Sequence, residues 1–182
     1  MSNHDFIDTA AGLWHDEFAQ LFEQSACIAA SAVLFEAATY FGREATILPV
    51  DTIAANAPAI ELIDAHVPID EWPDEAWSVG TSHDERCGIP GRYDGHVVCI
   101  VDGVLVDLTA GQMSRPQRGL LVPEVIVADG DVLHEGEIDL PGGNRVTYVA
   151  RPEQTGWRRA PDWKMRSVTA GPFIRQLRAR LA

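Results

Sequence analysis

A histidine and an aspartate, His96 and Asp107, stand at the two ends of a pattern that predicts a β-hairpin. Two valine-rich runs flank Asp102-Gly103, a pair that is the strongest short-range signal for a two-residue type I′ turn. Counting back from this turn places Val98 opposite Asp107. Because side chains alternate between the faces of a strand, His96 and Asp107 then share one face, roughly 7 Å apart at the backbone.

The chemistry that such a pair supports is nucleophilic catalysis. The other positions on both faces of the hairpin are mostly apolar, so we expect it to be buried on both sides. An unpaired buried carboxylate costs several kcal/mol, and His96 is the obvious partner for Asp107. An aspartate that orients a histidine is half of a nucleophilic triad, and the missing member is a cysteine or serine from elsewhere in the chain.

Cys27 is the candidate nucleophile. If Ser25 caps the helix expected over residues 26–41, Cys27 lies in the first turn, where free N–H groups and the helix dipole favour a thiolate. The alternative is that Cys27 simply packs in the core, since cysteine is among the most often buried residue types. Cys99 falls on the hairpin face away from His96, and we interpret it as a core residue.

The third cysteine, Cys87, lies in the segment His83-Asp84-Glu85-Arg86-Cys87. Two candidate ligands four residues apart, without a second pair, do not match a recognisable zinc site. We therefore predict a solvated loop here and expect neither a metal nor another cofactor. A protein that binds metal through cysteine and histidine stays an alternative, which metal analysis of the purified protein would reveal.

Composition limits the class of protein. The chain has 182 residues and a net charge of −13, and we expect one soluble domain over residues 1–182. An acidic body argues against a nucleic-acid binder. The longest uncharged run, residues 24–35, is far short of the roughly 20 residues that span a bilayer. Three irregularly spaced cysteines and no secretory leader favour the cytoplasm.

Charge is distributed unevenly along the chain. Residues 151–182 hold eight basic and two acidic side chains, against six basic and 25 acidic ones in residues 1–150. A final helix is expected from about Pro172. We predict that it docks on the acidic body through Phe173, Ile174 and Leu177. The alternative is a free basic arm that binds an acidic partner.

Apolar periodicity predicts helices before strands. Residues 5–23 and 26–41 have the pattern of helices, the first with Asp5 as N-cap and the second apolar on nearly every side. A short helix is expected over 54–65, capped by Asp51 or Thr52. Strands are expected at 46–50, at the hairpin, and at 120–128, 131–139 and 144–150, with a long loop over 66–95 and a brief strand at 77–79. This order is typical of the α+β class.

Taken together, these residues resemble the transglutaminase-like branch of the papain-like cysteine enzymes. The resemblance covers roughly residues 24–112 and is most specific at the hairpin, where Asp107-Leu108-Thr109 is followed by Gln112. Leu108 stands where the family has proline, and Val97-Val98 where many members have an aromatic residue. The resemblance implies a papain-like core in which N-terminal helices pack on an antiparallel sheet. It also implies that Cys27 is the nucleophile, His96 the base and Asp107 the orienting acid.

The predicted function is that of a thiol-dependent hydrolase or acyl-transferase acting on an amide or ester. Its partner is an acyl-bearing substrate such as a peptide or protein, not nucleic acid or membrane, and the oligomeric state stays open. Gln24 and Gln20 are the oxyanion-hole candidates beside the Cys27 N–H, and Trp77 and Gly95 are the substrate-loop candidates. The alternative is an inactive member of the fold that serves as a binding module through the 66–95 loop and the basic tail.

Overall fold

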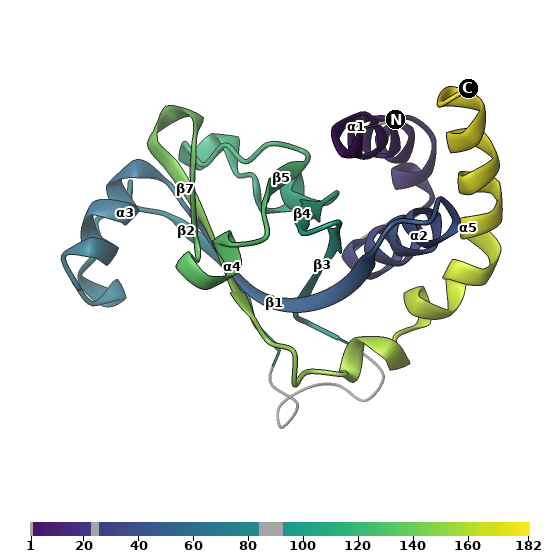
Figure 1. Cartoon of the computed structure of the whole chain (residues 1–182). Helices are drawn as coiled ribbons and strands as arrows, with labels where there is room; N and C mark the ends of the chain where they lie inside the picture. Colours follow the sequence, from purple (N-terminus) through teal and green to yellow (C-terminus); the bar gives the residue numbers. More distant parts are fainter. Residues whose placement is uncertain (1, 23–25, 84–92) are drawn as a thin grey trace.

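Figure 1 shows helices α1 (Asn3–Leu13), α2 (Cys27–Tyr40) and α5 (Pro161–Arg180) on one side of a curved sheet, with α3 (Ala57–Asp64) at the opposite end. The structure, a computed structural model, describes residues 2–22, 26–83 and 93–182. The helices are α1 Asn3–Leu13, α2 Cys27–Tyr40, α3 Ala57–Asp64, α4 Val132–Glu135 and α5 Pro161–Arg180. The strands are β1 Ala45–Ala55, β2 Ser78–Thr81, β3 His96–Val101, β4 Val104–Asp107, β5 Ile126–Asp129, β6 Glu137–Leu140 and β7 Asn144–Ala150. The predicted α+β class is confirmed at this level.

Strand β1 organises the sheet because its two halves have different partners. Residues 45–50 pair with β3, and residues 50–55 pair with β7. The short strand β2 pairs with residues 52–55 of β1, on the same edge of that strand as β3. The sheet order is β5-β4-β3-β1-β7-β6, and every pairing is antiparallel. Figure 1 shows that β1 bends along its length.

The sheet curls because a short connection joins its two outermost strands. β5 ends at Asp129 and β6 begins at Glu137, although these strands lie at opposite ends of the sheet order. Inward-facing side chains of five strands form one apolar cluster within the curl: Val50, Ala54, Val98, Leu105, Ile126, Val146 and Tyr148. The inner face of the sheet therefore has a core of its own.

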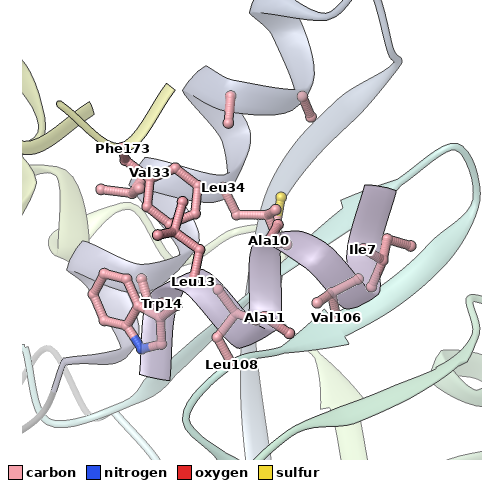
Figure 2. Packing of buried hydrophobic residues seen from close by; sticks show 14 of the residues in the cluster. Ile7, Ala10, Ala11, Leu13, Trp14, Val33, Leu34, Val106, Leu108 and Phe173 are labelled. Carbon is pink, nitrogen blue, oxygen red and sulfur yellow. The ribbon is translucent and has the colours of Figure 1, made fainter. Parts of the chain in front are cut away.

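A second core joins α1, α2 and α5 to the outer face of β3 and β4 (Figure 2). Helix α2 is apolar on nearly every side because α1, α5 and the sheet surround it, as Val33 and Leu34 illustrate. The predicted docking of the last helix is confirmed: Phe173 and Leu177 are fully buried in this cluster, and Ile174 packs against it. None of the helices in the described ranges is long and apolar enough to cross a membrane.

Two predicted helix caps were wrong. Ser2, not Asp5, caps α1, and Asp5 occupies the third position of a capping box. After Leu13 the helix continues as a π-helical turn, Trp14–Phe18, and a 3-10 turn, Ala19–Leu21. Asn56 caps α3, not Asp51 or Thr52 as expected. The reason is that strands on both edges of β1 extend it as a strand to residue 55.

Several predicted boundaries also moved. Only residues 126–128 of the expected strand 120–128 lie in a strand, β5, which ends at Asp129, and α4 interrupts the expected strand 131–139 before β6. Strand 144–150 is confirmed as β7. The last helix begins at Pro161 and continues through Pro172. Proline suits the first turn of a helix, and burial of Ala170 and Phe173 keeps the chain helical on both sides of Pro172.

Candidate functional site

The hairpin that carries the predicted histidine and aspartate has the expected turn. Asp102 and Gly103 both have positive φ values, 50° and 80°, which a two-residue type I′ turn requires. The register pairs Ile100 with Leu105 and Val101 with Val104, so its continuation places residue 98 opposite Asp107. The predicted two-residue turn and register are therefore confirmed.

His96 and Asp107 meet on the inner face of the sheet. The Nε2 atom of His96 lies 2.8 Å from Oδ2 of Asp107, and both side chains are buried. Burial by itself lowers the pKa of His96, because it disfavours a charged imidazole. The charge and hydrogen bond of Asp107, and to a smaller extent those of Cys27, outweigh burial and raise this pKa well above its ordinary value. The predicted pairing is confirmed, and the geometry favours an imidazolium facing a carboxylate.

The Asp107 carboxylate is saturated with donors. Oδ1 accepts from the Thr109 backbone N–H at 2.9 Å and from the Thr109 hydroxyl at 3.1 Å, while the Tyr148 hydroxyl donates to Oδ2 at 2.8 Å. Burial opposes ionisation of Asp107, but the His96 charge and these hydrogen bonds outweigh it and lower the pKa of this carboxyl. Burial and the Asp107 charge raise the pKa of Tyr148, so its hydroxyl remains a donor.

Cys27 approaches this pair from the helical side. It is the first residue of α2, as predicted, and it is buried; the N-cap position belongs to Ala26, and Ser25 lies outside the described residues. Ser31, one turn later on the same helix face, donates to the backbone carbonyl of Val97 at 3.0 Å and so anchors the start of α2 on β3. The thiol contributes to the raised pKa of His96 through a hydrogen bond and through its charge. Because Asp107 occupies Nε2, the ring nitrogen left for the thiol is Nδ1.

Tyr93 covers the same region. It belongs to the apolar cluster that contains Cys27, and its hydroxyl donates to Oε1 of Gln154 at 2.9 Å. Burial, followed by the charge of Cys27, raises the pKa of Tyr93. Gly95, predicted as a substrate-loop residue, makes room for this ring, since a Cβ there would lie 2.6 Å from the Tyr93 hydroxyl oxygen. The ring of His83 lies at a tilt to that of Tyr93, with 4.5 Å between the ring centroids.

Trp77, the other predicted substrate-loop residue, lies farther along the sheet. Its backbone N–H donates to Oδ1 of Asn56 at 3.0 Å, and Arg118 lies 4.6 Å above its ring. His96 pairs with Val50 of β1, and Asn56 follows six residues later, directly after the end of this strand. Six residues of extended chain span about 20 Å, so Trp77 lies far from His96. The structure thus gives Trp77 packing contacts at the far end of β1.

The structure describes some of the remaining candidate site residues, and others lie outside the described ranges. Gln20 is exposed on a 3-10 turn, whereas Gln24 and Cys87 lie outside the described residues, so both oxyanion-hole assignments stay predictions. Cys99 is fully buried, as predicted, and burial raises its pKa. His83, the described end of the segment considered for metal, is buried, and its Nδ1 accepts from a backbone N–H.

Tyr148 and Tyr93 also belong to this site, although neither was predicted as a site residue. The alternating pattern of residues 144–150 could have placed Tyr148 on the inward face of its strand. No local signal, however, indicates that β7 lies beside β1, the pairing that directs this hydroxyl to Asp107. Tyr93 lay in a segment predicted as loop, where no periodicity assigns a direction to a side chain.

Comparison with known proteins informs the fold but not the chemistry. No protein-family model matches the chain, and no curated protein matches it. A crystal structure described only as that of a genomics target is similar, with a TM-score of 0.52 and 13% sequence identity over 97% of this chain and 78% of the other. A similarity at this identity concerns the fold alone.

Proposed function

We propose that this protein is a thiol-dependent hydrolase or acyl-transferase that acts on an amide or ester bond, with a papain-like (transglutaminase-like) core. One observation carries the proposal: a buried imidazole bonds a saturated carboxylate through Nε2, and a cysteine thiol helps to raise the pKa of the same imidazole. In this proposal Cys27 is the nucleophile, His96 the acid and base, and Asp107 the orienting group. The substrate bears an acyl group, as a peptide or protein does, and the cytoplasm would keep the thiol reduced.

The proposed reaction has two steps. The Cys27 thiolate attacks the acyl carbon, and the imidazolium of His96 gives its proton to the leaving amine or alcohol, which leaves a thioester. Water or a second amine then attacks the thioester while His96 accepts the proton, and the thiolate is restored. The oxyanion would be stabilised by the free N–H groups in the first turn of α2, beginning with Cys27, because Ala26 offers no side-chain acceptor.

A binding module with the same fold is the second candidate function. The burial of the proposed nucleophile and base favours it. Only 4% of Cys27 and 5% of His96 are exposed. A cysteine that stays covered would pack in the core and would not react. The two candidates differ in whether the thiol of Cys27 reacts near neutral pH.

Mapping of thiol reactivity tests the proposal. The native protein is treated briefly with iodoacetamide near pH 7, and the labelled cysteine is identified by mass spectrometry. We expect label at Cys27 before Cys99, whose burial keeps it inert. His96→Ala should slow labelling at least tenfold, because the imidazolium no longer stabilises the thiolate. Labelling of Cys27 no faster than Cys99 in the folded protein would favour the binding module.

A further inference from the structure

Strand β1 has an unpaired edge along its first half. On one edge, β3 pairs with residues 45–50, whereas on the other edge β7 pairs only with residues 50–55. In the described part of the chain, no strand therefore lies against the β7-side edge of residues 45–48. Such an edge offers backbone donors and acceptors to another extended chain.

Two backbone hydrogen bonds show which groups this edge presents. The Glu44 carbonyl accepts from an N–H of the hairpin turn, while the Pro49 carbonyl accepts from the N–H of Arg151, which follows β7. Because these directions alternate along a strand, the N–H and C=O groups of Ala45 and Ile47 point to the β7 side. Among the described residues, these four groups have no hydrogen-bond partner.

A pocket of about 330 Å³ adjoins this edge, and its walls are largely aromatic. Its volume lies within the range of ligand sites in proteins. The rings of Trp157 and Trp163 meet at 89°, with 4.8 Å between their centroids. The pocket and the unpaired edge form one surface, the edge groove, which is lined by Phe35, Ala45, Thr46, Ile47, Trp157, Arg158 and Trp163.

The charge of the edge groove is positive. Arg158 is exposed and is the one charged residue in the lining. Its guanidinium carbon lies 5.1 Å from the centroid of the Trp157 ring, and no acidic side chain among the described residues pairs with it. A guanidinium beside apolar walls favours a ligand that combines a carboxylate with an apolar group.

We propose that the edge groove binds an extended acidic segment of a partner protein as an added antiparallel strand. The backbone of this segment exchanges two hydrogen bonds with Ala45 and two with Ile47. Residues that pair directly across two strands place their side chains on the same face, so the two segment residues opposite Ala45 and Ile47 point their side chains toward the pocket.

These two segment residues have different chemistry. One is apolar and packs against the tryptophans, and the other, two positions away, carries the carboxylate that pairs with Arg158. The inference does not depend on the proposed function, because none of these groups takes part in the proposed reaction.

A fluorescein-labelled peptide, Thr-Glu-Thr-Leu-Thr-Glu-Thr, tests the proposal by fluorescence anisotropy. In an extended chain its leucine shares one face with a glutamate two residues away on either side. We expect saturable binding to the wild-type protein, and replacing both glutamates with lysine should weaken this binding by roughly tenfold or more. Absence of saturable binding, or equal affinity for the two peptides, would overturn the proposal.

Methylation of the peptide backbone separates strand pairing from side-chain contact. N-methylation of the leucine removes an N–H that faces β1 and should weaken binding by roughly tenfold or more. N-methylation of the threonine that follows is the matched control, because its N–H points away from β1, and affinity should change by less than about threefold. Equal effects of the two methyl groups would overturn the added-strand geometry.

Reversing one charge in the protein tests the role of Arg158. Arg158→Glu should weaken binding of the glutamate peptide and strengthen binding of the lysine peptide, because attraction and repulsion are exchanged. Arg178→Glu, at an exposed position near the other end of α5, changes the net charge equally and should keep the wild-type preference. An Arg158→Glu protein that keeps the wild-type preference for glutamate would refute the assignment.

Analytical ultracentrifugation distinguishes a partner segment from a second copy of this chain, which could also pair along an open strand edge. We expect a monomer that binds one peptide. A dimer that excludes the peptide would overturn the proposal, because the edge groove would then be an interface between two copies.

Discussion

Replacing Asp107 with asparagine changes the charge of the site while keeping its shape. In the native site Oδ2 accepts from His96 and Tyr148, and Oδ1 accepts twice from Thr109. The asparagine oxygen can keep the Thr109 bonds, but its NH2 group, a donor, then replaces Oδ2. Nε2 of His96 must become an acceptor, so the ring proton moves to Nδ1, the nitrogen left for Cys27.

The effect on catalysis should be large because this tautomer cannot accept a proton from the thiol. The same carboxylate-to-amide change in a serine-protease triad lowers kcat by about 10⁴-fold. We expect a similar loss here, equivalent to about 5.4 kcal/mol in the activation free energy.

The effect on stability should be smaller and should depend on pH. Losing a charged hydrogen bond costs about 1–3 kcal/mol. The folded pKa of Asp107 is lowered from 3.8, so its contribution to stability is present above that value and is lost as pH falls through the folded pKa. The pKa of His96 is raised from 6.5, so its contribution is complete below 6.5 and is lost as pH rises through the raised pKa. The wild-type advantage should be largest between about pH 4 and 6.5.

The measurements are kcat for 4-nitrophenyl acetate and the thermal unfolding midpoint across pH 3 to 10, with circular dichroism to check the fold. Asp70→Asn, at an exposed position, is the control and should change neither quantity. An Asp107→Asn protein that retains kcat within tenfold of wild type, while folded, would refute the assignment of Asp107 as the orienting group.

Three further changes test neighbouring features. Tyr148→Phe removes one donor to the carboxylate, so the pKa of Asp107 should rise and acid unfolding should begin at higher pH; an unmoved acid transition would contradict this. Gly95→Ala places a Cβ 2.6 Å from the Tyr93 hydroxyl and should lower ester hydrolysis at least tenfold, whereas Gly12→Ala, with nothing within 4 Å, should leave it unchanged; equal rates would refute the contact. Leu177→Ala should destabilise the protein by about 2–5 kcal/mol in denaturant titrations, and a value below about 0.5 kcal/mol would mean that α5 does not hold the core.

Local patterns in the sequence determined the hairpin and the side chains that share its face. The Asp-Gly pair specifies a two-residue turn, and the turn specifies the register, so the meeting of His96 and Asp107 followed from residues close in sequence. The apolar pattern of residues 26–41 likewise predicted a central helix with Cys27 in its first turn. These features depend on short-range sterics and on periodicity, which a single sequence displays.

Only the tertiary structure decided what surrounds that pair. Tyr148 reaches Asp107 because β7 pairs with the second half of β1. No local pattern specifies such pairings. The pairing of strands far apart in sequence is determined by how the whole sheet buries its apolar side chains. The same burial kept α5 helical through Pro172, where propensity alone predicted a helix start.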